Sequence, residues 1–215
     1  MGRRARFSRA ELEGAAIAVV DEHGLAGLTM RAVAARLGTG PMTLYNYVAD
    51  RAALDALVVD GVLRGITIPH SPSSDWRVDV RGLAEELWRA VRPHPNAIPL
   101  VLARRSQSET FLDAAEALLA ALARSGLDGE DLLVAFRAVT TLAAAFAQTE
   151  LTGPLSARNG GADATIDRFR SLPTERYPRL IEIAGAARTS TPEAEFRRGL
   201  QALLDGLQPK STQRR

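Results

Sequence analysis

Cysteine is absent from the 215 residues of this chain, lysine occurs once and histidine three times. Without cysteine the chain has no disulfide framework, no thiolate zinc site and no thiol nucleophile, a composition that suits a reducing cytoplasm. No run of apolar residues approaches the roughly 18 that a membrane span requires, and the arginine-rich start lacks the apolar segment of a signal peptide. We therefore expect a soluble, cytoplasmic protein that does not enter a membrane.

The net charge is only +2, which does not by itself indicate a nucleic-acid-binding protein, but the basic residues are unevenly distributed. Residues 1–10 carry four arginines and no acidic residue, and residues 23–49 carry Arg31 and Arg36 and no acidic residue. For the first six residues a solvated basic tail and a phosphate-binding segment are both consistent with this pattern.

Apolar residues recur with helical spacing and no segment alternates like a β-strand, so the sequence predicts an all-α fold. Ser8 and Glu11 form a capping-box pattern at the start of the first helix, which we expect to end at Gly24. The expected helices cover about residues 8–24, 29–38, 41–48, 50–65, 75–92, 96–105, 108–125, 129–151, 174–187 and 191–208.

A loop rich in proline and serine, residues 68–74, separates the first four expected helices from the others. We therefore expect an N-terminal domain over residues 1–50 with a linking helix over 50–65. A larger helical domain is expected over 66–208, followed by a tail over 209–215. Residues 156–164, which include two adjacent glycines, are expected to form a mobile loop.

Residues 28–48 have the layout of a helix-turn-helix, because two short amphipathic helices are joined by a turn that contains glycine. The second helix would expose side chains able to contact bases and phosphates when its N-terminus enters a major groove. These are Pro41, Met42, Thr43, Tyr45, Asn46 and Tyr47. The alternative is a small helical subdomain in which the two tyrosines only pack.

Four segments of this region resemble the TetR family of bacterial transcriptional regulators in their order and spacing. They are Leu28–Arg31, Ala34–Gly38, Thr43–Val48 and Arg51–Leu54. The resemblance is close over residues 8–60 and looser over the remainder, which is similar to the tetracycline-repressor type of C-terminal domain. It implies an N-terminal three-helix DNA-binding domain, a larger helical ligand-binding and dimerisation domain, and a homodimeric repressor that a small-molecule inducer releases from a double-stranded DNA operator.

The resemblance also implies how individual residues contact DNA. Those that hold a phosphate or an outer base are Thr29, Arg31, Tyr45, Tyr47 and Arg51, the last in place of a lysine. Met42 and Thr43 face the groove, beside Pro41 and Asn46. Since Pro41 and Met42 stand where the founding member of the family has glutamine and proline, its operator sequence is not carried over.

Two helices of the second domain carry apolar stripes that can build a four-helix dimer interface, two helices from each subunit. The stripes are Leu132, Phe136, Val139, Ala143 and Phe146 on one helix, and Phe196, Leu200, Leu203 and Leu207 on the other. An intramolecular core is the alternative. The family resemblance favours the dimer, because two recognition helices must be held about one DNA turn apart to bind a palindrome.

By the same resemblance, the inducer binds among the helices after residue 75, between mainly apolar walls that carry a few polar groups. The candidates are Leu87, Trp88, His94, Asn96, Val101, Arg104, Phe111, Thr140, Thr141 and Gln148, each of which can also be an ordinary core or surface residue. The positions that match the drug and magnesium site of tetracycline repressors hold Thr67, Leu83, Leu87 and Val101. These residues provide no magnesium ligands, so neither a metal nor a cofactor is expected.

Two other functions use features of the same sequence. A transcriptional activator or a DNA-binding protein without ligand control would use the same helix-turn-helix. A helical-bundle enzyme is the more distant alternative, because the chain lacks His-Glu-x-x-His, a Glu-x-x-His pair and a phosphate-binding glycine loop. We therefore predict no catalytic residues.

Overall fold

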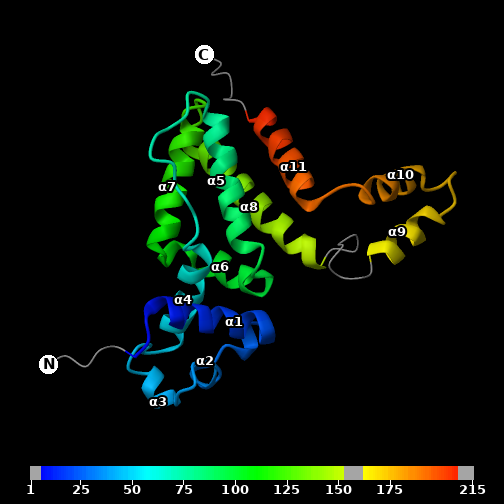
Figure 1. The fold of residues 1–215 in the computed structure, drawn as a ribbon. Helices are drawn as coiled ribbons and strands as arrows, with labels where there is room; N and C mark the ends of the chain where they lie inside the picture. The colour runs from blue at the N-terminus through cyan, green and yellow to red at the C-terminus, as the bar shows by residue number, and fades with distance from the viewer. Residues whose placement is uncertain (1–5, 153–161, 208–215) are drawn as a thin grey trace.

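The computed structural model of the chain describes residues 6–152 and 162–207, and within these two ranges the regular structure is entirely helical (Figure 1). The predicted all-α fold is confirmed. The expected tail over 209–215 and residues 156–161 of the expected mobile loop lie outside the described residues.

Four helices form a bundle at the N-terminal end, at the bottom of Figure 1. They are α1 (Arg9–Gly27), α2 (Met30–Arg36), α3 (Pro41–Leu44) and α4 (Arg51–Leu63). The capping box at the start of α1 is present, since the Ser8 hydroxyl accepts from the Glu11 amide and the Ser8 amide donates to the Glu11 carboxylate at 2.7 Å. The Ser8 amide and the Ser8 hydroxyl both donate to the Glu11 carboxylate, which favours its charged form and lowers the pKa of Glu11.

Glycines with positive φ set the two breaks in this bundle. Gly24 has a φ of 65° and interrupts α1 where the helix was expected to end, but one more turn follows as far as Gly27. Gly38, with a φ of 63°, makes the turn between α2 and α3. Regular helix in α3 stops at Leu44, four residues before the expected end, and hydrogen-bonded turns continue the chain to Val48.

The N-terminal bundle has a buried ion pair that the sequence pattern did not reveal. The Glu13 side chain on α1 is only 3% exposed, and it accepts hydrogen bonds from Arg9 at 2.9 Å and from Arg64 at 2.8 Å. Arg9 also reaches Asp60 of α4 at 2.5 Å. These bonds compensate the cost of burying a carboxylate and fix α1 against α4.

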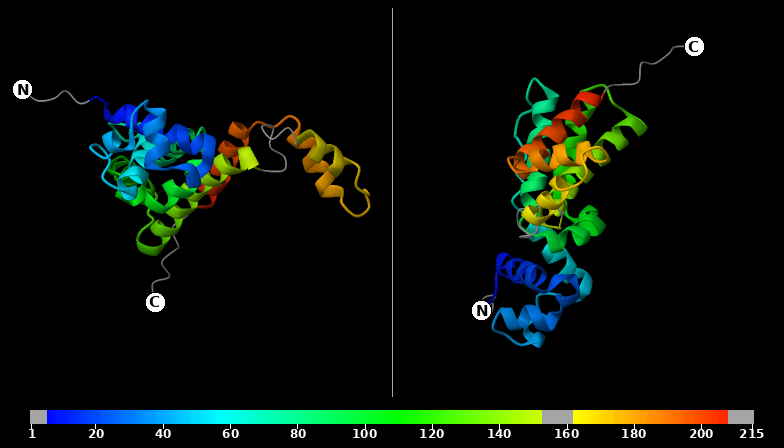
Figure 2. Two further views of the ribbon diagram at one scale, coloured as in Figure 1. Left: turned by 90° about the horizontal axis from the view of Figure 1, so that it is seen from below. Right: turned by 90° about the vertical axis from the view of Figure 1, so that its right-hand side faces the viewer.

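The larger part of the chain packs around α5, which contacts both α7 and α8. Its α-helices are α5 (Trp76–Val91), α6 (Ile98–Arg104), α7 (Glu109–Ala123), α8 (Gly129–Thr152) and α11 (Pro192–Gly206), with 3₁₀ turns at η1 (Pro95–Ala97) and η2 (Arg105–Gln107). The helix α4 runs from the N-terminal bundle to this part and contacts α5, α6 and α7 (Figures 1 and 2).

Some residues expected at a dimer interface have no accessible surface within the single chain. They are Val139, Ala143, Phe196 and Leu200. The Phe196 ring stacks on Trp88 with ring centres 5.1 Å apart and meets Phe146 edge-on at 5.8 Å. The expectation of dimer contacts is wrong for these four residues, because they form the core between α5, α8 and α11. This is the intramolecular alternative.

The composition of helix α8 contradicts the prediction that no segment is apolar enough for a membrane span. Residues Gly129–Glu150 are long and apolar enough to cross a membrane by length and composition, with a mean hydropathy of 1.5. The helix packs against α5, α7 and α11 on its inner face, and 33% of the segment is buried within the single chain. Its apolar outer face remains accessible.

The last part of the described chain forms a helical hairpin of α9 (Ala162–Arg170) and α10 (Pro178–Ala187), which pack on each other. The hairpin projects away from the other helices in Figure 1 and in the left view of Figure 2. Residues 162–164, expected in a mobile loop, belong to α9 instead, and α10 begins at Pro178 rather than near residue 174. Proline at the first position favours that start.

Candidate nucleic-acid interface and ligand cavity

One face of α3 is anchored in the core and the other faces solvent. Leu44 and Val48 are buried in the same cluster as Val33 of α2. On the opposite side, Met42 is 78% exposed and Tyr45 is 48% exposed. Pro41 and Asn46 are also exposed, and Thr43 is half-buried. These side chains are therefore accessible to a binding partner on the face opposite the core.

The residues at the start of α2 lie beside this surface with donors available. The Thr29 hydroxyl accepts a hydrogen bond from the Ala32 amide at 3.1 Å, and as a hydroxyl it still has a hydrogen to donate. Arg31 is exposed and has no acidic partner within the described ranges. Arg36, by contrast, is held by Glu22 at 2.6 Å. Thr29 and Arg31 are therefore placed to meet an anion.

The two tyrosines of the motif have different surroundings. Tyr45, which directly follows α3 as its C-cap, is exposed. Tyr47 is half-buried, its ring meets Phe7 edge-on at 5.9 Å, and its hydroxyl accepts a hydrogen bond from the Arg6 amide at 2.9 Å. Tyr47 thus contacts the segment that precedes α1.

Arg51, predicted to clamp the DNA backbone, is largely engaged inside the protein. It donates to the Leu28 carbonyl at 2.6 Å, to the Leu25 carbonyl at 3.4 Å and to the Asp55 carboxylate at 2.8 Å. These bonds tie the first turn of α4 to the end of α1. The side chain is still 54% exposed, so a further contact to a phosphate is geometrically open.

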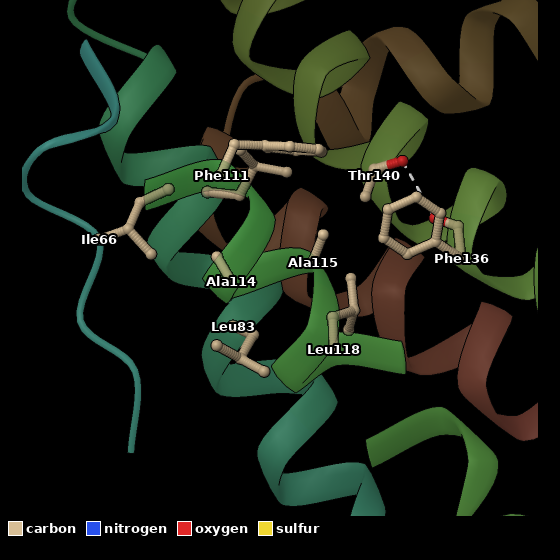
Figure 3. A pocket seen from close by; sticks show the side chains of 9 residues that line it. Ile66, Leu83, Phe111, Ala114, Ala115, Leu118, Phe136 and Thr140 are labelled. Carbon is tan, nitrogen blue, oxygen red and sulfur yellow. Dashed lines mark hydrogen bonds between the residues drawn. The ribbon is translucent and has the colours of Figure 1, made fainter. Parts of the chain in front are cut away.

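A small cavity lies among α5, α7 and α8 (Figure 3). Its wall consists of Ile66, Leu83, Leu87, Phe111, Ala114, Ala115, Leu118, Phe136 and Thr140. The space measures only about 20 Å³, close to the size of one water molecule. The one polar wall residue is Thr140, whose hydroxyl donates to the Phe136 carbonyl at 3.0 Å. The cavity therefore fits apolar chemistry but has to widen before a larger molecule can bind.

The cavity contains three of the predicted inducer-binding residues, namely Leu87, Phe111 and Thr140. Phe136 lines it as well, although it was expected at the dimer interface. The others do not line this cavity: they are Trp88, His94, Asn96, Val101, Arg104, Thr141 and Gln148. Sequence reasoning missed the alanines and Ile66, because small or loop-borne apolar residues carry no signal of a binding wall.

Several of the misplaced candidates lie where the two parts of the chain meet. His94 Nδ1 is 2.8 Å from Asp21 Oδ2 on α1, and the Asn96 amide donates to the Asp21 carbonyl at 3.0 Å. Arg104 of α6 lies 3.6 Å from the buried carboxylate of Asp55 on α4. These contacts make a polar joint between the N-terminal bundle and the larger part.

The outer face of α8 remains accessible in the single chain. Leu133 is 43% exposed and Val134 is 58% exposed, and Thr141 and Gln148 are also exposed on this helix. The predicted interface residues that keep partial exposure are Leu132, Phe136, Phe146, Leu203 and Leu207. Within residues 6–152 and 162–207, no group of three histidine, aspartate or glutamate side chains is arranged to hold a metal ion.

Sequence comparison matches both parts of the chain to known domains. Residues 14–54 match the family described as bacterial regulatory proteins, tetR family, and residues 68–211 match the tetracyclin repressor-like C-terminal domain. The HTH-type transcriptional repressor DrrR1 of Streptomyces coeruleorubidus is 31% identical over 210 residues, which cover 94% of this chain and 77% of that protein.

Structural comparison points the same way. ActR of Streptomyces coelicolor in complex with actinorhodin aligns with a TM-score of 0.74 and 25% identity, over 94% of this chain and 96% of that one. BioQ bound to its double-stranded DNA operator aligns with a TM-score of 0.58 and 26% identity, over 76% of this chain and 98% of that one.

Proposed function

Because this chain belongs to the tetR family of bacterial transcriptional regulators, we propose that it is a homodimeric repressor that binds a palindromic operator and leaves it when an inducer binds. Its family members are regulators and not enzymes, so the enzyme alternative is set aside. Since a protein that binds an operator acts where the bacterial chromosome lies, we propose the cytoplasm as its location.

The observation that carries the proposal is the exposed face of α3 and the turns that follow it. Leu44 and Val48 fix this segment in the core, and Met42 and Tyr45 are exposed on its other side. A helix anchored in this way can enter a major groove without rearranging its own core. We propose that base edges meet Met42 and Thr43. The residues proposed to hold phosphates or outer bases are Thr29, Arg31, Tyr45, Tyr47 and Arg51, with Pro41 and Asn46 alongside.

The domain boundaries follow the same division. We propose residues 1–50 as the DNA-binding domain, α4 as the connection, and residues 66–208 as the ligand-binding and dimerisation domain. α4 lies in both parts, since it carries Arg51 at its start and contacts α6 along its length.

We propose a largely apolar, ring-containing inducer for the cavity among α5, α7 and α8. Two aromatic rings, Phe111 and Phe136, face it, and no charged side chain lines it. Such a wall favours an apolar ligand with one polar group near Thr140. ActR, a structural relative, has been solved in complex with actinorhodin. The cavity of this chain, at about 20 Å³, has room for one water molecule.

The route from cavity to DNA runs through α4. Ile66, three residues after α4, lines the cavity, and Arg104 of α6 meets Asp55 of α4, which also holds Arg51. An inducer that widens the cavity would displace these contacts and change the spacing of the two α3 helices in the dimer. Operator affinity then falls by the same coupling factor by which DNA weakens inducer binding.

For the dimer we propose the outer faces of α8 and α11. On α8 this face carries Leu133, Val134 and Thr141, and on α11 it carries Arg198 and Ala202. All five are exposed in the single chain. Two such helices from each subunit form the four-helix bundle predicted from the sequence. The contact residues differ from the predicted ones, because they lie on the neighbouring, exposed face of each helix.

The test is selection of bound DNA from a randomised pool by the full-length chain, followed by footprinting on the selected duplex. We expect a palindromic motif whose binding Tyr45→Ala abolishes. The matched control is Val78→Ala on α5, a similarly exposed position, 49% against 48%, outside α3. Enrichment of no motif, or equal loss with both variants, would refute sequence-specific binding through α3. Reporter transcription with and without the protein separates repression from activation.

A further inference from the structure

A second and wider cleft lies beneath the loop that joins α4 to α5. Its volume is about 270 Å³, against about 20 Å³ for the cavity of Figure 3, and it is bounded by the loop, α5 and α7. The α7 wall contains three alanines, Ala117, Ala120 and Ala121. Because these small side chains leave the space unfilled, the cleft approaches the volume of small-molecule sites, which begin near roughly 300 Å³.

The end of the loop is fixed over the cleft by an ion pair between α5 and α7. The two carboxylate oxygens of Asp79 accept from the Ser73 amide at 3.1 and 3.0 Å, and Arg124 donates to the Ser73 carbonyl at 2.6 Å. Arg124 also pairs with Asp79. Pro69 and Pro72 line the cleft from the loop, and each proline ring restricts its own φ. The loop is therefore preorganised, and a molecule that enters the cleft does not have to order it.

The wall chemistry favours a neutral ligand with one hydrogen-bond acceptor. Among the described residues that line the cleft, only Asp79 and Arg124 are charged, and their charges cancel. The buried Asp79 carboxylate already accepts hydrogen bonds from Ser73 and Arg124. The guanidinium has five N–H donors, of which Ser73 and Asp79 use two. A remaining donor can bind a ligand oxygen, while Ile68, Leu83 and the alanines contact an apolar ring.

The cleft and the small cavity are neighbours that share one side chain. Leu83 of α5, labelled in Figure 3, lines both spaces. The loop contributes Ile66 to the cavity and Ile68 to the cleft, and α7 contributes Leu118 to the cavity and Ala117 to the cleft. A molecule in the cleft therefore lies against the wall of the cavity.

We propose that the cleft beneath residues 68–72 is the first binding site of the inducer, and that it takes a neutral, ring-containing molecule with a carbonyl oxygen directed at Arg124. This inference rests on the proposed function where it names that molecule as the inducer. The bound molecule contacts Leu83, and displacement of this side chain widens the inner cavity. The widened cavity then acts on α4 through Ile66.

The experiment compares two small molecules that differ by one oxygen atom. They are 1-indanone, a fused-ring ketone, and indane, the same ring system without the carbonyl. Their dissociation constants for the full-length chain are measured by ligand-observed NMR titration in the absence of DNA. Ala120→Trp fills the cleft from an exposed position on α7. Ala123→Trp is the matched control, because Ala123 is exposed on the same helix and does not line the cleft.

We expect Ala120→Trp to abolish the binding of both molecules and Ala123→Trp to leave both dissociation constants unchanged, with similar melting temperatures for the two variants. Arg124→Lys tests the hydrogen bond, because lysine keeps a positive charge beside Asp79 but lacks the planar fork of donors. This variant should weaken the binding of 1-indanone roughly tenfold, the effect of one hydrogen bond to a charged group, and leave that of indane unchanged.

Three results would overturn the inference. They are an absence of binding to the wild-type chain, equal binding to Ala120→Trp and Ala123→Trp, and equal weakening of both molecules by Arg124→Lys. The last result would mean that the lysine moves the loop and that the ligand oxygen is not bound by Arg124. Since these titrations contain no DNA, they do not depend on an operator. If the titrations agree with the inference but the wild-type chain selects no duplex, the cleft is a ligand site and it is the proposed function that fails.

Discussion

Replacing Phe196 with alanine separates a core role for this residue from a role at the dimer interface. The side chain has no accessible surface and lies between Trp88 and Phe146, with ring centres 5.1 and 5.8 Å away. Truncating a buried phenylalanine costs about 3–5 kcal/mol through lost transfer free energy and the cavity left behind. For a domain of this size, that corresponds to a melting temperature lowered by roughly 6–20 °C.

Urea denaturation at several protein concentrations measures the free energy of unfolding, and sedimentation measures the dissociation of the dimer. We expect Phe196→Ala to lower the free energy of unfolding by the same amount at every concentration, because the lost contacts lie within one subunit. The matched control is Val134→Ala on the outer face of α8, which is 58% exposed. It should weaken the dimer and leave the stability of the subunit nearly unchanged. A Phe196→Ala variant that dissociates without losing subunit stability would refute the assigned packing.

Further predictions concern the turn, the ion pair, the cavity and the first helix. Gly38→Ala should cost about 1–2 kcal/mol, since the φ of 63° suits glycine, and Gly38→Asn should cost less; equal urea midpoints for both variants would contradict this. Arg64→Met leaves the buried Glu13 carboxylate with Arg9 as its remaining ion-pair partner. Denaturant titrations should show a free energy of unfolding lowered by about 1–3 kcal/mol, and an unchanged value would mean that Glu13 is solvated. Phe111→Ala should enlarge the cavity, lower the melting temperature and allow benzene to restore part of it; a melting temperature insensitive to benzene would show that the site collapses. Because the pKa of Glu11 is lowered in the folded protein, its contribution to stability is complete above the ordinary value of 4.5 and is lost as pH falls through the lower folded value. The stabilities of wild type and Glu11→Gln should therefore converge in acid denaturation. A stability difference that widens as pH falls would contradict this.

Local signals in the sequence were sufficient for the N-terminal part of the fold. The capping box at Ser8 and the glycine turn at Gly38 depend on residues adjacent in the chain, and the structure has both. The length of α3 was overestimated because the periodicity of Leu44 and Val48 does not distinguish a regular helix from a succession of hydrogen-bonded turns.

Packing partners could not be obtained in the same way. An apolar stripe shows that a helix face is buried but not which surface buries it, and for Phe196 that surface belongs to its own chain. The polar inducer-binding candidates were expected to orient a ligand, whereas the side chains of His94 and Arg104 lie at the joint with Asp21 and Asp55. Such long-range pairs depend on the tertiary arrangement, which no periodicity encodes.

The small volume of the cavity has a consequence for the sensitivity of a cell to the inducer. A ligand that needs an open form binds with an apparent dissociation constant equal to its intrinsic value divided by the open fraction, so an opening of ~1% turns ~1 nM into ~0.1 µM. The small alanine and leucine side chains that fill the space would thereby set a response threshold. Abundant metabolites of moderate affinity remain below that threshold, and only a compound that holds the wall open at high affinity exceeds it.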